Sequence, residues 1–279
     1  MQTIFTAIGK NNRTIWARPL FVALVVVLFA SSPFSSRAQG LDSLDNQGTA
    51  KVTMVIDGDT IWLDDGRKVR LVGIQAPELS FGRSDFKPNP FGEAAKKQMA
   101  TLSLGKSVTI YTGVASTDRH GRTLGHVVIN DDNKTWLQGE MLRLGMAHVY
   151  TFADNRALAN EMLEIEKTAR KNNVGIWANK IYKIISADDS VNYVGTYRLV
   201  EGKVLSAQKV GTNVYLNFGP VWRTDFTILV EKDGLALFAK NNVDPLAFQG
   251  KNVRVRGWLK NKNGPMIVAT HPEQIEIIK

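Results

Sequence analysis

Residues 51–78 read KVTMVIDGDTIWLDDGRKVRLVGIQAPE, and this stretch decides the fold of the first part of the chain. Apolar and polar residues alternate along it, which is typical of half-buried β-strands. Two polar turns, Asp57-Gly58-Asp59 and Asp64-Asp65-Gly66, interrupt the alternation, and Asp-Gly between apolar runs is a strong hairpin signal. The stretch therefore predicts short antiparallel strands joined by tight turns.

Two more strands and three helices are predicted further along the chain. Residues 108–111 and 124–129 have the composition of strands. The first helix is predicted to follow Asn89-Pro90, and the second to start from a capping box at residues 135–138. The third carries an apolar stripe at helical spacing and ends before Gly175. We therefore predict an α+β domain over residues 51–183.

The pattern changes after about residue 186, where strand-like runs replace helical periodicity. The runs lie at residues 200–205, 214–218, 226–230, 253–259 and 266–269, with one short helix near 235–240. Short strands in such number predict a small, mostly-β barrel. We place this second domain at residues 191–279 and note its general likeness to an oligonucleotide-binding (OB) barrel.

The first 38 residues have the pattern of a secretory signal peptide. They hold four bases and no acid, and residues 20–30 are an unbroken apolar run. Small residues at Ser36 and Ala38 predict cleavage after Ala38. Because a bilayer span needs about 20 apolar residues, no stable membrane span is expected after cleavage. We expect a periplasmic or secreted protein, with residues 39–50 as a linker; an uncleaved anchor is the alternative.

Composition narrows the chemistry that this chain can perform. It has 279 residues, no cysteine and four scattered histidines, which excludes disulfide scaffolds and thiolate metal sites and disfavours a multi-histidine site. Any metal is therefore expected to be bound by oxygen. The formal net charge of +9 falls to +5 without the four bases of the signal segment, a balance compatible with a polyanionic partner but equally with an ordinary surface.

Three segments carry residues suited to phosphodiester chemistry. They are residues 57–60 (DGDT), 69–78 (VRLVGIQAPE) and 118–122 (DRHGR). In an extended strand Arg70 projects to the same side as Val72 and Ile74, so its guanidinium needs an anionic partner, which a bound phosphate would supply. Metal-assisted phosphodiester hydrolysis needs carboxylates that bind a hard cation and activate water, and arginines that bind the phosphate oxygens. These segments contain both.

These segments resemble the thermonuclease, or staphylococcal nuclease-like, family over about residues 51–180. The resemblance rests on Asp-Gly-Asp-Thr, Arg-Leu-x-Gly-Ile-x-Ala-Pro-Glu and Asp-x-x-Gly-Arg, in that order. It implies a five-stranded OB barrel with three helices and calcium-dependent cleavage of DNA and RNA. The leading hypothesis is therefore an exported nuclease with an accessory barrel.

The resemblance also implies roles for individual residues. Arg70 and Arg122 would be phosphate clamps, and Glu78 the general base that activates water. The residues at the family's metal and nucleotide positions are Asp59 and the Ala76 carbonyl as calcium ligands, Asp57 as an outer-shell acid, and Tyr150 and Phe152 near the base-stacking aromatics.

One position departs from the family's pattern. Gln75 stands where familiar members have a second calcium-binding aspartate. An amide oxygen can bind calcium, but the loss of one negative charge should weaken the site, since affinity follows the charge of the ligands. Two alternatives therefore stay open: a catalytically weakened nucleic-acid-binding protein, and a cell-envelope module that binds protein or peptide.

One segment of the C-terminal domain can be interpreted either as a second nucleic-acid-binding surface or as an ordinary half-buried strand. Lys251, Arg254, Arg256 and Trp258 combine bases with an aromatic residue, as single-strand-binding barrels do. The same alternation is what any half-buried strand shows.

Overall fold

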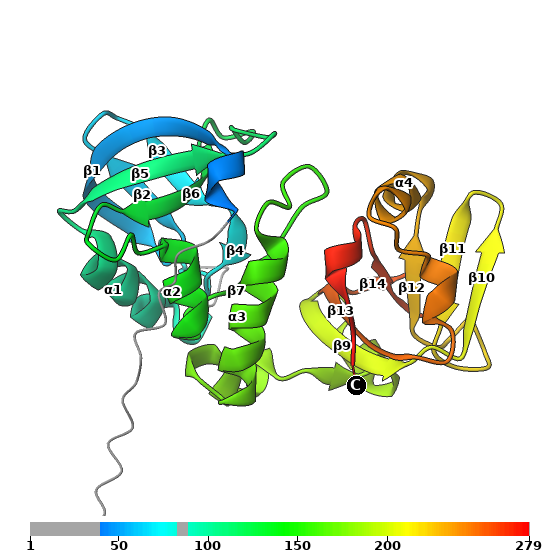
Figure 1. Cartoon of the computed structure of the whole chain (residues 1–279). Coiled ribbons are helices and arrows are strands. Elements are labelled where there is room, and N and C mark those ends of the chain that lie inside the picture. Colours follow the sequence, from blue (N-terminus) through cyan, green and yellow to red (C-terminus); the bar gives the residue numbers. More distant parts are fainter. Residues whose placement is uncertain (1–39, 83–88, 279) are drawn as a thin grey trace, which may run out of the picture. The chain divides into compact units, whose positions relative to one another are not determined.

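The computed structural model describes residues 40–82 and 89–278 (Figure 1). The predicted signal segment and its cleavage site after Ala38 lie outside these residues. Within the described part of the chain, no helix has the length and apolarity that crossing a membrane requires.

Five strands close into the N-terminal barrel in the order β1-β2-β3-β6-β5. The turns at residues 57–60 and 64–67 join β1 to β2 and β2 to β3 as antiparallel neighbours, β3 pairs in parallel with β6, and β1 closes the barrel against β5. The barrel strands are β1 (Asp45–Asp57), β2 (Thr60–Leu63), β3 (Lys68–Leu71), β5 (Ser107–Thr112) and β6 (Thr123–Ile129).

The predicted linker over residues 39–50 is wrong for most of its length. A short 3-10 helix occupies Leu41–Ser43, and β1 begins at Asp45, opposite Thr112 of β5. The polar character of residues 45–49 reflects a strand whose side chains are exposed here. Since strand pairing supplies the backbone hydrogen bonds, this segment needs few apolar residues to be ordered.

A bulge in β1 overturns the simple alternation of Val52, Met54 and Ile56. The β1–β2 register shifts between Val52 and Met54, and again before Asp57. Val52 and Val55 are buried, whereas Met54 is 54% exposed. An extra residue in one strand exchanges the two faces beyond it. The first shift therefore places Val55 rather than Met54 on the buried face, and the second shift lies directly before the Asp57-Gly58-Asp59 turn.

Three helices accompany this barrel, as predicted: α1 (Gly92–Ser103), α2 (Leu137–Arg143) and α3 (Ala159–Lys171). The predicted capping box of α2 is wrong. The cap residue is Trp136, which is buried and makes no side-chain capping bond. The Thr135 hydroxyl instead donates a hydrogen bond of 2.8 Å to the carboxylate of Asp131, four residues earlier in the chain.

A single apolar core joins this barrel to its helices. Barrel residues such as Ile61, Leu71 and Val127 pack with Met141 of α2 and Met162 of α3. A two-stranded sheet, β4 (Gly73–Gln75) with β7 (His148–Tyr150), contributes Ile74 and Val149 to this core. The α+β barrel with three helices is confirmed.

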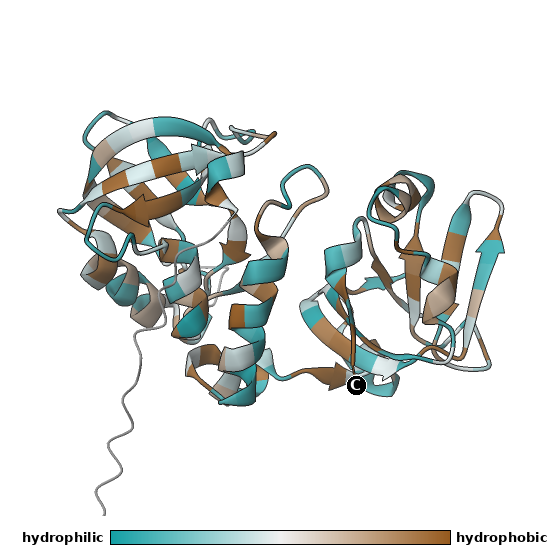
Figure 2. Ribbon diagram, viewed as in Figure 1, coloured by the Kyte–Doolittle hydropathy of each residue, from teal (hydrophilic) through white to brown (hydrophobic). Residues whose placement is uncertain are grey.

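The C-terminal β region, residues 185–278, has its own apolar core. Its strands form two sheets, in the orders β10-β11-β12-β15-β14 and β16-β13-β9-β8, and Figure 2 shows brown, hydrophobic segments along the strands of both parts of the chain. This is the mostly-β, OB-like architecture that was predicted. Its elements are β8 (Ile185–Ser186), β9 (Tyr197–Lys203), β10 (Ser206–Val210), β11 (Asn213–Asn217), β12 (Thr227–Val230), α4 (Lys232–Lys240), β13 (Asn252–Trp258), β14 (Lys260–Asn261), β15 (Pro265–Val268) and β16 (Ile275–Ile277).

Charged side chains connect α3 to the C-terminal β region, and the described residues belong to one compact unit. Arg256 of β13 binds Glu166 of α3 through two hydrogen bonds of 3.0 Å, and both side chains are at most 1% exposed. Glu276 of β16 accepts hydrogen bonds from Arg256 at 2.6 Å and from Arg170 at 2.8 Å. This contact is a buried ionic network rather than an apolar one.

Candidate active site

A cavity of about 240 Å³ brings together the residues that the sequence singled out. They come from the β1–β2 turn, from β3, from β4 and the loop that follows it, and from the residue before β6. The polar residues that line it are Asp57, Asp59, Arg70, Gln75, Glu78 and Arg122, with the backbone of Ala76.

The parallel pairing of β3 with β6 brings the two arginines together. Val69 lies opposite Thr123 in the β3–β6 register, so Arg70 on β3 lies close to Arg122, the residue directly before β6. Arg122 ends a tight turn in which Gly121 has φ of +74°, a conformation that glycine adopts without strain. Asp118 accepts a hydrogen bond of 2.7 Å from the Arg122 Nε, which orients the guanidinium.

The Asp57-Gly58-Asp59 turn packs closely against the residues after β4. A Cβ atom on Gly58 would lie 2.6 Å from the Cβ of Ala76 and 2.7 Å from that of Ala95, so only glycine fits without a shift. The close approach lets the Ala76 amide donate to an Asp59 Oδ at 2.7 Å. Asp59 itself is 3% exposed.

Arg70 has a carboxylate partner within the protein. The sequence indicated that this guanidinium needs an anion, and the structure supplies Asp59, whose Oδ1 lies 3.1 Å from the Arg70 Nε. Arg70 also donates to the carbonyls of Leu71 and Ile74, the latter at 2.8 Å, and to the Gln75 Oε1 at 3.0 Å. Arg70 therefore ties β3 to β4.

Burial raises the pKa of Asp59 to about 7. The positive charge of Arg70 opposes this increase, and the neighbouring carboxylate of Asp57 adds to it. Two buried carboxyl groups that lie close together are difficult to ionise at the same time, because their negative charges repel. A nearby positive charge stabilises their ionised forms.

The oxygen atoms of this cavity fit a hard cation that prefers oxygen ligands. Asp59 supplies a buried carboxylate, Gln75 an amide oxygen and Ala76 a backbone carbonyl, which is the chemistry that calcium takes. In the described ranges, no group of three or more His, Cys, Asp or Glu side chains could hold a metal ion. The set is thus low in charge, and the Gln75 Nε2 already donates to the Ala76 carbonyl at 3.0 Å.

Glu78 lies on the loop after β4, where its backbone carbonyl accepts a hydrogen bond of 3.0 Å from the Asn89 amide. It lines the same cavity as Arg70 and Arg122, and its side chain is exposed. A carboxylate in this position is accessible to water and to a bound phosphate ester.

Tyr150 and Phe152 lie outside this cavity. Tyr150 belongs to β7 and lines an adjacent groove that also includes Gln75 and Glu78. Phe152 is 54% exposed and packs edge-on against Tyr150, with ring centroids 5.1 Å apart. Of the two predicted base-stacking residues, only Tyr150 lines a hollow next to the site.

The sequence did not assign several residues that shape this region. Asp118 orients Arg122, and the Asp-x-x-Gly-Arg spacing was the signal for it. His148 and Tyr197 line the adjacent groove together with Trp258, which the sequence had singled out only as part of a separate C-terminal surface. No local pattern brings residues so far apart in the chain together. The proposed role of Arg254 and Arg256 as nucleic-acid ligands is contradicted, since glutamates bind both.

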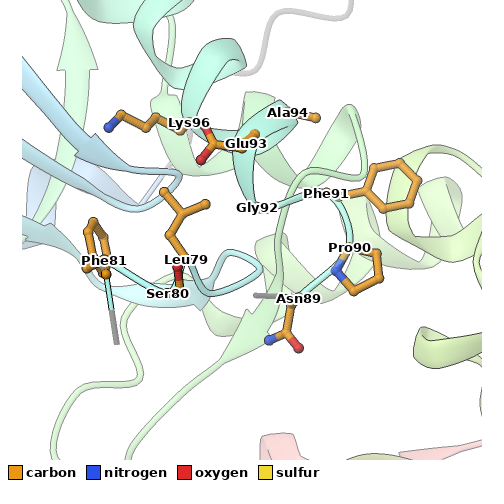
Figure 3. A pocket seen from close by; sticks show the side chains of 11 residues that line it. Leu79, Ser80, Phe81, Asn89, Pro90, Phe91, Gly92, Glu93, Ala94 and Lys96 are labelled. Atoms are coloured by element: carbon orange, nitrogen blue, oxygen red, sulfur yellow. The ribbon is translucent and has the colours of Figure 1, made fainter. Parts of the chain in front are cut away.

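A larger hollow of about 630 Å³ shares Leu79 and Phe81 with the candidate site. Figure 3 shows its lining, in which Glu93 and Lys96 of α1 face a wall of apolar and small residues. Its described lining residues include one acid, Glu93, and one base, Lys96, and no arginine, whereas two arginines and a glutamate line the smaller cavity.

Comparisons with known proteins agree with this geometry. A model of staphylococcal nuclease homologues matches residues 68–179. The chain is 34% identical over 166 residues to protein ParB of Escherichia coli, covering 56% of this chain and 82% of ParB. It is 30% identical over 172 residues to the thermonuclease of Staphylococcus hyicus, covering 57% of this chain and 95% of that protein.

This chain belongs to the staphylococcal nuclease family. A further member, the micrococcal nuclease of Shigella flexneri, is 30% identical over 167 residues, which cover 57% of this chain and 84% of that nuclease. The family match includes Arg70, Gln75, Glu78 and Arg122 and ends before the C-terminal β region. That region is therefore an addition to the family domain.

Proposed function

We propose that this protein is an endonuclease that hydrolyses the phosphodiester bonds of DNA or RNA with the help of a bound metal ion. The observation that carries the proposal is the shared cavity of Arg70, Glu78 and Arg122. A carboxylate and two guanidinium groups around one small cavity match a phosphodiester, whose oxygens become more negative during hydrolysis. Membership of the staphylococcal nuclease family supports the same activity.

In this proposal Glu78 removes a proton from a water molecule that attacks the phosphorus atom. Its exposed carboxylate can accept that proton and hold the water in line. As the new P–O bond forms, the P–O bond on the opposite side breaks, and the leaving sugar oxygen takes up a proton from solvent. Arg122 binds the phosphate oxygens. Its Nε donates to Asp118, and its terminal nitrogens, which pair with no carboxylate among the described residues, face the substrate. Arg70 stabilises the negative charge from the other side of the cavity, on the strand next to Arg122.

Calcium is the ion that the family resemblance implies, and Asp59, Gln75 and the Ala76 carbonyl are the residues that would hold it. When bound, it would polarise a phosphate oxygen and add positive charge near the reacting group. With Asp57 beside Asp59, the cavity offers such an ion two carboxylates.

The test is to incubate the protein with single-stranded DNA, with and without calcium. We expect cleavage that requires calcium and stops when a chelator is added. Extracellular calcium sites bind the ion with dissociation constants of up to about 1 mM. Absence of cleavage even at about 10 mM calcium would therefore overturn the enzymatic proposal.

A second candidate function is nucleic-acid binding without efficient cleavage, and Gln75 is the observation that favours it. Its amide is hydrogen-bonded both to Arg70 and to the Ala76 carbonyl, so a cation must displace these bonds. Binding to phosphates would then remain and would weaken steeply between about 50 and 200 mM salt. Salt dependence would also distinguish this candidate from a peptide-binding envelope module.

Gln75→Asp separates the two candidates. The aspartate adds a negative charge to the ligand set and frees the Ala76 carbonyl, so we expect calcium affinity to rise by about one to two orders of magnitude. Calorimetric titration with calcium measures this, and the cleavage rate at limiting calcium should rise in parallel. Gln98→Asp on α1, away from the cavity, is the control. An unchanged affinity in Gln75→Asp would mean that calcium binds elsewhere.

We also propose that the protein is exported and acts in the periplasm or outside the cell. The support is the basic, then apolar, then small-residue pattern of residues 1–38. We expect the mature protein to begin at Gln39, which intact-mass measurement of the purified extracellular or periplasmic fraction can show. Retention of residues 1–38 in that fraction would contradict cleavage after Ala38.

A further inference from the structure

The groove next to the candidate active site is built partly by the C-terminal β region. It has a volume of about 370 Å³ and shares Gln75, Ala76, Pro77 and Glu78 with the region of the catalytic cavity. Its other walls include Tyr197, Arg198 and Trp258, which lie outside the matched family domain. The groove therefore continues from the reacting carboxylate onto residues that the family does not supply.

Aromatic rings form one wall of this groove. Tyr197 begins β9 and lies opposite Trp258 at the end of β13, and their ring centroids are 6.2 Å apart. Tyr197 also contacts Tyr150, at 5.0 Å between centroids, while His148 stacks on Tyr197 at 5.0 Å. The rings thus support one another.

Trp258 is fixed in place yet accessible. Its indole nitrogen donates a hydrogen bond of 3.2 Å to the Tyr150 hydroxyl, while the residue is 51% exposed. A large ring that is half exposed and held by a hydrogen bond offers a flat face to a ligand at little cost in conformational freedom.

Positive charge lies beside these rings. Arg198 and Lys183 line the same groove, and within the described residues neither forms a salt bridge with a carboxylate. The Arg198 guanidinium lies 4.9 Å from the centre of the Tyr193 ring and donates to the Tyr197 carbonyl at 3.2 Å. This contrasts with Arg254 and Arg256 on β13, whose charges are neutralised by glutamates.

We propose that the C-terminal β region supplies a subsite for an unpaired nucleotide, in which a base stacks on Trp258 and a neighbouring phosphate contacts Arg198. The inference rests on the proposed function of the adjoining cavity and extends it: the favoured substrate is single-stranded. Stacking on an exposed ring requires an unpaired base, and alternation of aromatic and basic groups along a groove is how proteins bind single strands without sequence preference.

Binding of fluorescent oligothymidylates tests the subsite. The Glu78→Gln protein is the parent, so that no cleavage occurs, and anisotropy is measured at one fixed salt concentration. We expect Trp258→Ala to weaken binding of a strand of about twelve nucleotides by about tenfold, and to leave a strand of about three nucleotides almost unaffected. Trp258→Phe should restore most of the affinity, because a ring is retained. Arg198→Ala should weaken binding and reduce its salt dependence.

Trp222→Ala is the matched control. Trp222 is 52% exposed, as Trp258 is, and lies on the C-terminal β region outside this groove. Equal affinity of Trp258→Ala and the parent for the longer strand would overturn the proposal, as would an equal loss in Trp222→Ala. Failure of the proposed function is visible separately: the protein with Glu78 intact would bind strands in a Trp258-dependent way but would not cleave them.

Discussion

Replacing Glu78 by glutamine is expected to lower the rate of DNA cleavage by about 10²- to 10⁴-fold, the usual contribution of a general base. Glutamine has nearly the same shape but cannot take the proton of the attacking water. Since the Glu78 side chain is exposed, the fold should be unaffected, and the affinity for single-stranded DNA should change little. The loss should therefore fall on the turnover rate rather than on the Michaelis constant.

Steady-state cleavage of a labelled single strand in saturating calcium gives both quantities. Glu93→Gln is the matched control, because Glu93 is an exposed glutamate on α1 that lines the neighbouring hollow but not the site. We expect its rate to equal that of the unmodified protein. A Glu78→Gln protein that retains more than about a tenth of the activity would assign the proton transfer to another group.

Glu166→Gln is expected to lower the free energy of unfolding by about 3–5 kcal/mol, the usual cost of breaking a buried ion pair on one side. Glu166 is fully buried, binds both terminal nitrogens of Arg256 and accepts the Val149 amide at 2.5 Å. Burial would raise the pKa of Glu166, but Arg256 and Arg170 hold that pKa below its ordinary value. Neutral glutamine would leave a buried guanidinium without its main partner.

Denaturation by urea, followed by tryptophan fluorescence, measures the change. Glu164→Gln on the same helix is the control: its ion pair with Lys167 is exposed on both sides, so a loss of at most about 1 kcal/mol is expected. The double variant Glu166→Leu with Arg256→Met removes one charge of each sign. Its free energy of unfolding should therefore fall by less than that of Glu166→Gln alone. Similar losses in Glu164→Gln and Glu166→Gln would show that water reaches the buried network.

Local sequence patterns predicted the hairpins of the barrel, whereas the closed barrel and the roles of the site residues were implied by the resemblance to the nuclease family. Asp-Gly turns flanked by alternating apolar residues favour hairpins, so β2 and β3 followed directly from residues 57–71. That the candidate site residues lie in one cavity follows in part from their spacing. Arg70, Gln75 and Glu78 are close in sequence, and the motif that contains them forms one strand, one turn and one short strand.

Other features depend on contacts between residues far apart and were therefore missed. The bulge that buries Val55 responds to the partner strand and not to the alternation of β1 itself. Asp59 as the partner of Arg70 requires the β1–β2 turn to pack on Ala76, which only the folded chain shows. Arg256 looks like a surface base in an alternating strand, and its burial becomes favourable only because Glu166 of α3 meets it.

The pairing of Asp45 with Thr112 at the barrel seam has a consequence for biogenesis. The first strand leaves the ribosome early, but its partner is made only after much of the domain has been translated, so the cylinder cannot seal before then. Contacts between such distant segments also slow folding. A newly made polypeptide of this design therefore keeps an unsealed barrel until the residues around Thr112 have been synthesised.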